Sequence, residues 1–150
     1  MCNFCPKSLV CIDKAISLHS FKLNVQKILR YSIMEKSFIS FVENSIKKNW
    51  DLDALTDYKG ATLQYKDVAR KIEKLHIIFE NSGVVKGDKI AICGRNSSHW
   101  GVVFLATLTY GAVAVPILHE FKADNVHNIV NHSEAKLLFV GDMVWENLNE

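Results

Sequence analysis

The pattern of apolar and polar residues first predicts a surface helix and a hairpin. After Ser37, apolar residues recur at helical spacing as far as Ile46, and the segment ends at "NWD", as a short surface helix would. The stretch "DALTDYKGATLQY" (53–65) is typical of two short strands around a tight turn. We place the turn at Lys59 and Gly60 and expect the glycine to supply the positive φ that a tight hairpin needs.

A longer amphipathic helix is predicted in "KDVARKIEKLHIIFENSG" (66–83). Gly83 stands where a helix commonly stops. His76 lies beside the apolar face, where a packed histidine with satisfied hydrogen bonds is expected rather than a catalytic one. The residues that repeat on the apolar face are Val68, Ile72, Leu75 and Phe79.

Strand and helix patterns then alternate, which predicts an α/β fold with a parallel β-α-β-α-β sheet and right-handed crossovers. The strands are continuous apolar runs, because helices are expected to cover both faces of the sheet. The segments in order are "KIAIC" (89–93), "SHWGVVFLATLTY" (98–110), "AVAVPIL" (112–118), "ADNVHNIVNHS" (123–133), "KLLFVG" (136–141) and the start of a helix at "MVWENLN" (143–149).

An uncharged stretch from Asn96 to His119 is long enough to cross a bilayer of about 30 Å. However, Gly111 falls at a natural helix end and Pro116 sits inside a β-branched segment. A helix, a glycine stop and a buried strand explain these positions, whereas one spanning helix explains neither. The sequence therefore predicts no transmembrane segment.

The same region raises the question of a nucleotide loop, since strand "IAIC" runs through "GRNSS" into a helix whose first N–H groups are free. The loop contains one glycine, Gly94, and matches neither the dinucleotide fingerprint nor the Walker loop. We favour Asn96 or Ser97 as the helix N-cap over either residue as a phosphate ligand.

Charge is distributed unevenly along the chain. Residues 1–33 hold five basic side chains against Asp13 alone, whereas residues 34–150 hold 13 basic and 15 acidic ones. A slightly acidic body without a basic stripe excludes nucleic acid as a partner. Residues 14–30 have the pattern of a basic amphipathic helix, which is typical of a membrane-surface helix or a transit peptide. We favour the alternative that Met34 is the true start and that residues 1–33 are an upstream extension outside the fold.

The cysteines do not have the spacing of a disulfide framework. Cys2, Cys5 and Cys11 lie close to the start, and together with His19 they form an unusual spacing for zinc, so no metal is assigned. No apolar segment near the start is long enough for a signal peptide. We expect the protein in the cytoplasm, and contact with a membrane surface through the leader or an apolar substrate stays open.

Several other side chains are candidates for chemistry. His119 and Glu120 follow a predicted strand at its carboxyl end, where open α/β sheets place ligands, although a solvated loop is the simpler interpretation. His127 and His132 stand five residues apart, so a helix points them in different directions, and we interpret them as surface residues. Cys93 follows a buried strand without a base nearby in sequence, so we expect a small buried hydrophobe.

Four segments together resemble the N-terminal region of the adenylate-forming (AMP-binding) enzymes, and most closely the long-chain fatty acid–CoA ligases. Each segment is weak alone, but their order and spacing are fairly specific. The resemblance covers about residues 36–150. The segments are "TLQYKDV" (62–68), "GVVKGDKIAI" (83–92), "NSSHW" (96–100) and "GAVAVPI" (111–117).

This resemblance implies a two-step enzyme that uses ATP, Mg²⁺ and coenzyme A. A fatty acid and ATP give an acyl-adenylate and pyrophosphate, and coenzyme A then displaces AMP to form a thioester. Such enzymes hold the phosphates with a Ser/Thr/Gly-rich loop ending in Pro-Lys-Gly and bind adenine and metal through a later Tyr-Gly-x-Thr-Glu segment. The chain matches neither motif as far as Glu150. We therefore assign no catalytic, cofactor-binding or metal residue, and expect none of these ligands to bind tightly to this chain alone.

Residues 34–150 are accordingly predicted to be the truncated N-terminal portion of a larger acyl-CoA synthetase domain, inactive alone. Its partners are expected to be the remainder of the synthetase and the fatty acid. An apolar edge or face should then lie uncovered and allow self-association. The alternative is a stand-alone α/β binding module without catalytic activity.

Overall fold

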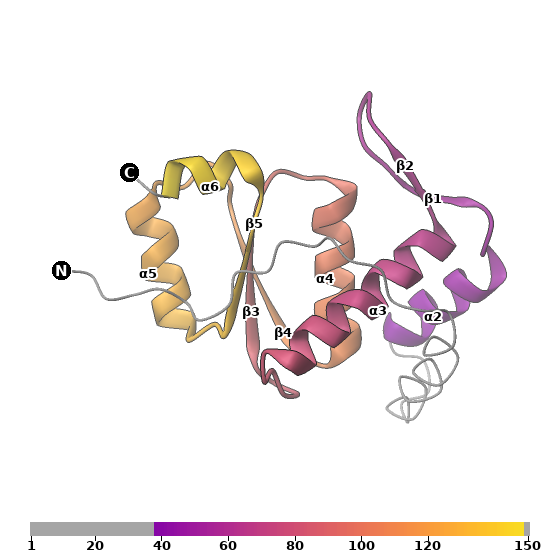
Figure 1. Cartoon of the computed structure of the whole chain (residues 1–150), viewed down its shortest axis with the longest axis horizontal. Helices are drawn as coiled ribbons and strands as arrows, with labels where there is room; N and C mark the ends of the chain where they lie inside the picture. The colour runs from indigo at the N-terminus through magenta and orange to yellow at the C-terminus, as the bar shows by residue number, and fades with distance from the viewer. Residues whose placement is uncertain (1–37, 149–150) are drawn as a thin grey trace.

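The computed structural model describes residues 38–148, which form an α/β fold with one hairpin and one parallel sheet (Figure 1). Every predicted element within this range is present, with bounds close to those expected. The elements are α2 (Phe38–Lys48), β1 (Asp53–Thr56), β2 (Thr62–Gln64), α3 (Tyr65–Asn81), β3 (Lys89–Cys93), α4 (Ser98–Tyr110), β4 (Val113–Ile117), α5 (Ala123–Ser133), β5 (Leu137–Val140) and α6 (Asp142–Leu148).

The sheet has the strand order β4-β3-β5, and both pairs are parallel, as predicted. Figure 1 shows the sheet between two helical layers, with α3 and α4 on one side and α5 and α6 on the other. This arrangement explains why β3 is an unbroken apolar run, since Ile90 through Cys93 are all buried.

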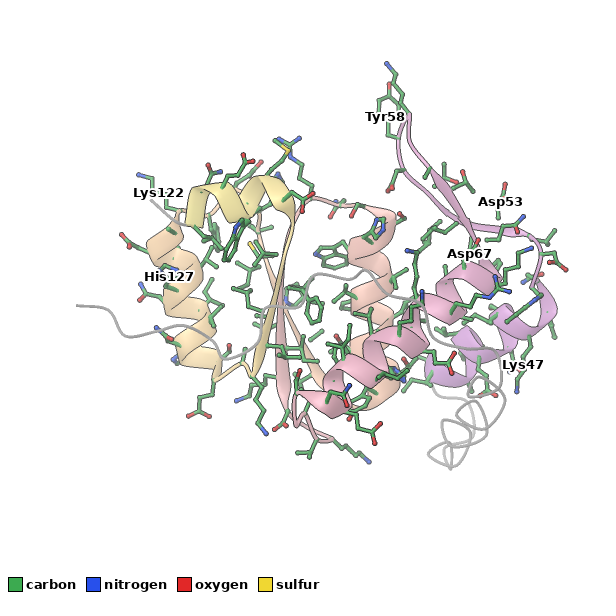
Figure 2. All side chains as sticks on the ribbon, viewed as in Figure 1. Lys47, Asp53, Tyr58, Asp67, Lys122 and His127 are labelled. Carbon is green, nitrogen blue, oxygen red and sulfur yellow. The ribbon has the colours of Figure 1, made fainter. Side chains whose placement is uncertain are left out.

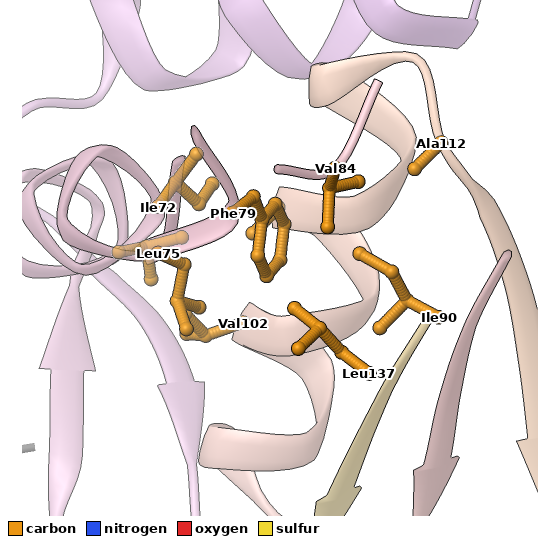
Figure 3. Packing of buried hydrophobic residues seen from close by; sticks show 10 residues of the cluster. Ile72, Leu75, Phe79, Val84, Ile90, Val102, Ala112 and Leu137 are labelled. Atoms are coloured by element: carbon orange, nitrogen blue, oxygen red, sulfur yellow. The ribbon is translucent and has the colours of Figure 1, made fainter. Parts of the chain in front are cut away.

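Alternation along β3 divides the interior into two cores. Ile90 belongs to a core with residues of α3 and α4, whereas Ala91 and Cys93 belong to a second core with Val126 of α5 and Val144 of α6. Figure 3 shows the first core. Its buried members are Val68, Ile72, Leu75, Phe79, Val84, Ile90, Val102, Ala106, Ala112 and Leu137, which include all four residues predicted for the apolar face of α3.

The uncharged stretch is a helix and a strand, as predicted. α4 ends at Gly111, whose φ of +85° is left-handed, and Gly111 N–H and Ala112 N–H bond back to Leu108 O and Thr107 O. The chain then enters β4, which contains Pro116. Within residues 38–148, no helix has both the length and the apolar character needed to cross a membrane.

The β1–β2 hairpin corrects one expectation. The left-handed residue of its turn is Lys59, with a φ of +54°, and Gly60 does not have a positive φ. Gly60 is needed for a different reason, because a Cβ at this position would lie 2.9 Å from Cβ of Asp57. The glycine thus allows a close approach inside the turn. Figure 2 shows Tyr58 at the far end of the hairpin, where its side chain is 89% exposed.

Apolar side chains are exposed in several places among the described residues. No residue of α2 is fully buried, and Phe38 and Phe41 of this helix are both more than half exposed. At the β4 edge of the sheet Val113 is also exposed. The predicted extension 1–33, including the leader helix and the cysteine-rich start, lies outside the described residues.

Candidate functional site

A depression lies at the carboxyl edge of the sheet, between the ends of β3 and β4. The loop after β3 leads to α4 on one face, and the loop after β4 leads to α5 on the other face (Figure 1). Such a point, where neighbouring connections diverge, is where open α/β sheets bind ligands. The depression has a volume of about 320 Å³. Its lining residues are Gly94, Asn96, Trp100, Pro116, Ile117, Leu118, His119 and Glu120.

Two glycines shape one side of this edge. Gly94 follows β3 and Gly141 follows β5, and a Cβ built on Gly94 would lie 3.5 Å from Gly141 N. Gly141 N–H donates to Cys93 O over 2.9 Å. The two backbones therefore meet directly on the β5 side, and the space that remains lies on the β4 side.

The walls of the depression are largely apolar. The indole of Trp100 stacks on Phe104, with ring centroids 5.3 Å apart and planes 11° from parallel. Leu118 is exposed on the opposite wall. The polar groups at its rim are the Asn96 amide and the side chains of His119 and Glu120, whose Nε2 and Oε1 atoms are 4.0 Å apart. Both residues line the depression, so their loop does contribute to a concave surface, and a ligand role for them stays a prediction.

The N-terminus of α4 is already occupied by an anion from the chain itself. Ser98 N–H donates to Oδ1 of Asp57 over 2.6 Å, and Ser98 Oγ donates to Oδ2 over 2.8 Å. These bonds, led by the backbone one, hold the pKa of Asp57 below its ordinary value. Of the two predicted N-cap candidates, Asn96 and Ser97, the structure has Ser97 as the N-cap. Its Oγ accepts a hydrogen bond from Trp100 N–H over 3.1 Å.

This arrangement does not fit a nucleotide phosphate at α4. The N–H group and dipole end that would attract a phosphate are satisfied by the Asp57 carboxylate. Ser98 N–H, the first N–H group of α4, is therefore not free to bind a phosphate. A group of three His, Cys, Asp or Glu side chains able to hold a metal ion is also absent from residues 38–148.

The remaining candidates lie apart from the depression's polar rim. His76 is buried, with Nε2 3.0 Å from both Ala106 O and Thr109 Oγ1, so the expectation of a packed, satisfied histidine is confirmed. Burial lowers the pKa of His76. His127 and His132 are exposed on α5, and Figure 2 shows His127 pointing away from the sheet.

Cys93 is buried at the end of β3, as predicted. Burial raises the pKa of its thiol, and Sγ lies 3.8 Å from Leu118 O. A thiol with a raised pKa is a poor nucleophile at neutral pH, because the thiolate is the reactive form. Cys93 therefore acts as a small hydrophobe of the second core.

Asp57 is the residue of this region that sequence reasoning missed. Its contact with Ser98 joins positions 41 residues apart, and an aspartate before a turn is common in any hairpin. The sequence predicted Trp100 on a helix, but it did not predict that Trp100 lines the same depression as Pro116 and Leu118. The parallel pairing of β3 and β4 brings these loops together.

Comparison with known proteins agrees with this architecture. The family described as AMP-binding enzyme matches residues 42–150. Long chain acyl-CoA synthetase 3 of Arabidopsis thaliana is 35% identical over 75 residues, which are 50% of this chain and 11% of that protein. Fatty acid–[acyl-carrier-protein] ligase ScoC of Streptomyces coeruleorubidus is 29% identical over 84 residues, which are 56% of this chain and 16% of that protein.

Among solved structures, the N-terminal subdomain of NpsA from Klebsiella oxytoca has a TM-score of 0.63 at 22% identity, covering 72% of this chain and 28% of that one. At this identity the likeness concerns the fold alone. The solved structure supports the α/β fold, and the family match supports the class of protein. The chain belongs to the AMP-binding enzyme family, as the counterpart of the N-terminal part of such an enzyme, and it spans less than a fifth of the curated relatives named here.

Proposed function

We propose that residues 34–150 are the N-terminal portion of an AMP-forming acyl-CoA synthetase whose substrate is a long-chain fatty acid. The observation that carries the proposal is the family match over residues 42–150, together with the β4-β3-β5 sheet and its two helical layers. The relative that is 35% identical is named a long chain acyl-CoA synthetase, which supports the fatty acid and coenzyme A as substrates.

The proposed reaction has two steps. The carboxylate of the fatty acid attacks the α-phosphate of ATP, which gives an acyl-adenylate and releases pyrophosphate. The thiol of coenzyme A then attacks the acyl carbon, forms a thioester and releases AMP. ScoC is named a ligase that joins a fatty acid to an acyl carrier protein. The acceptor of the acyl group, coenzyme A or a carrier protein, therefore needs an assay of its own.

ATP, Mg²⁺ and coenzyme A are proposed as ligands of the longer enzyme. We assign this portion a structural and binding role. Its two cores hold the sheet, and the depression beside Trp100 and His119 supplies an apolar wall to the ligand path. We propose the cytoplasm as the compartment, with the apolar substrate as the reason for contact with a membrane surface.

The first experiment is to determine the transcript beyond codon 150. The proposal expects the reading frame to continue and to encode a Ser/Thr/Gly-rich loop with a lysine within about a few dozen codons. A stop codon directly after Glu150 in every transcript would contradict it and favour a stand-alone binding module.

The second experiment measures ATP-dependent thioester formation by the encoded enzyme. Palmitate with coenzyme A should react faster than acetate or benzoate, and faster than palmitate with a carrier protein.

Trp100→Ala should reduce turnover roughly tenfold, which corresponds to about 1.4 kcal/mol. Trp100→Phe keeps the ring stack, so this variant should retain most of the turnover of the parent enzyme. Tyr58→Ala, at the exposed hairpin tip, is the matched control and should have no effect. Equal rates for Trp100→Ala and the parent enzyme would contradict the proposal that the depression lies on the path of the ligand.

A further inference from the structure

We infer that Asp57 is a positioning residue for the depression, because it holds the loop of residues 94–97 and the start of α4 in place. The inference depends on contacts inside residues 38–148 and not on which surfaces of the chain are open. Where it concerns turnover it rests on the proposed function, which places the depression on the ligand path.

The hairpin turn aims the Asp57 side chain at α4. The backbone of Asp57 is fixed on both sides, because its N–H donates to Ala61 O and its C=O accepts from Gly60 N–H, each over 3.0 Å. A Cβ on Gly60 would lie 2.9 Å from Asp57 Cβ, closer than such atoms approach each other in proteins. The glycine therefore leaves the room in which the Asp57 side chain lies.

The Asp57 carboxylate binds the first residue of α4 by two hydrogen bonds. Its Oδ1 accepts from Ser98 N–H over 2.6 Å, and its Oδ2 accepts from Ser98 Oγ over 2.8 Å. These bonds, led by the backbone one, hold the pKa of Asp57 below its ordinary value, so both oxygens are acceptors near neutral pH. Ser98 is buried, and a contact made by both carboxylate oxygens fixes the direction of the helix start as well as its distance.

Strand β1 also packs on the first turn of α4. A Cβ built on Gly101 would lie 3.5 Å from Leu55 Cδ1, so Leu55 lies directly over this glycine. Gly101 N–H donates to Ser97 O over 3.0 Å, which makes Gly101 part of the first hydrogen-bonded turn. The hairpin and the helix are therefore joined at Ser98 and at Gly101, on either side of Trp100.

These attachments bracket the residues that form the α4 side of the depression. Asn96 stands two residues before Ser98 and Trp100 two residues after it, and both line the depression. The other end of the loop is fixed at Gly94, which meets the backbone at the end of β5. Asp57 lies outside the set of described residues that line the depression, so it acts on the wall through Ser98.

The first test is amide hydrogen exchange of the encoded enzyme, read on peptides that cover residues 94–104. Asp57→Ala removes both acceptors and should raise exchange there by roughly tenfold, whereas peptides that cover α5 should be unchanged. Asp57→Asn keeps one carbonyl oxygen for Ser98 N–H and should retain most of the protection. Asp53→Ala changes an exposed aspartate of the same hairpin (Figure 2) and is the matched control, with exchange as in the parent.

Two results of this test would overturn the inference. One is unchanged exchange at residues 94–104 in Asp57→Ala. The other is a rise in every peptide, which would show general destabilisation in place of a local anchor. The readout needs no catalytic activity.

The second test is a double-mutant cycle with Trp100, measured as kcat/KM for palmitate. Asp57→Ala should lower this value by roughly tenfold, because a displaced wall misaligns the bound ligand. If Asp57 acts through the Trp100 wall, the variant that carries both Asp57→Ala and Trp100→Ala should be no worse than Trp100→Ala alone.

A merely structural role would instead make the two losses multiply to roughly a hundredfold, and that result would overturn the inference. A parent enzyme without thioester formation would contradict the proposed function. The exchange data would then decide by themselves whether Asp57 positions the loop.

Discussion

At the scale of single residues, two buried or half-buried polar groups join segments that are far apart in the sequence. Asp57 ties the hairpin to the first turn of α4, and His76 of α3 bonds the backbone of α4 at Ala106. Each contact satisfies groups that would otherwise be costly to remove from water. Both side chains therefore act in folding, by fixing how α3, α4 and the hairpin lie together.

His76 should make stability depend on pH in the mildly acidic range. Burial lowers its pKa in the folded state, so the unfolded chain binds the proton more readily. Stability is then complete above the unfolded pKa of about 6.5 and falls as the pH drops from there toward the lowered folded value. Urea unfolding at pH 8 and pH 5.5 measures this loss. His76→Gln should reduce it, and His127→Gln on the exposed face of α5 should not. An equal pH dependence in all three proteins would contradict this role.

At the scale of elements, local pattern predicted most of what the structure contains. In α3 the apolar residues recur every three or four positions, a spacing that only a helix places on one face. The apolar runs of β3, β4 and β5 are short and are typical of buried strands. The positions of these elements could therefore be predicted from the sequence. The turn was harder, because Lys59 and not Gly60 takes the left-handed conformation. The sequence alone does not show whether a glycine in a turn is needed for a positive φ or because a Cβ would clash with a neighbouring atom.

The contact of Asp57 with Ser98 and the walls of the depression could not be predicted in this way. Both depend on how β3 pairs with β4 and on where the hairpin packs, and these are long-range outcomes with no local signal. The carboxyl edge as the place to look did follow from the predicted parallel sheet.

Two glycines of the α4 region provide a matched test of the helix and its stop. Gly111→Ala puts a Cβ at a φ of +85° and 3.3 Å from Lys86 Cγ, so it should destabilise the chain by about 1 kcal/mol or more. Gly101→Ala lies inside α4 with its nearest neighbour, Leu55 Cδ1, at 3.5 Å, and should stabilise by up to about 1 kcal/mol. Denaturant midpoints of both variants check the signs. Destabilisation by Gly101→Ala equal to that by Gly111→Ala would contradict the assigned helix end.

At the scale of the whole molecule, the chain has the α/β fold of the N-terminal part of an AMP-binding enzyme. The two cores on either side of β3 are complete enough to hold the sheet, and the carboxyl edge has a concave surface. Yet the N-terminus of α4 is bonded to Asp57, and the family's phosphate loop is absent from the sequence. We therefore expect the chemistry of adenylation to lie outside these 150 residues.

Carboxylate-dependent exchange of pyrophosphate into ATP tests this expectation most directly. The purified chain, with Mg²⁺ and palmitate, should show no exchange above a reaction without protein, and a complete acyl-CoA synthetase should exchange readily in the same assay. Exchange that requires both the chain and the fatty acid would contradict the account, because residues within this sequence would then hold the phosphates.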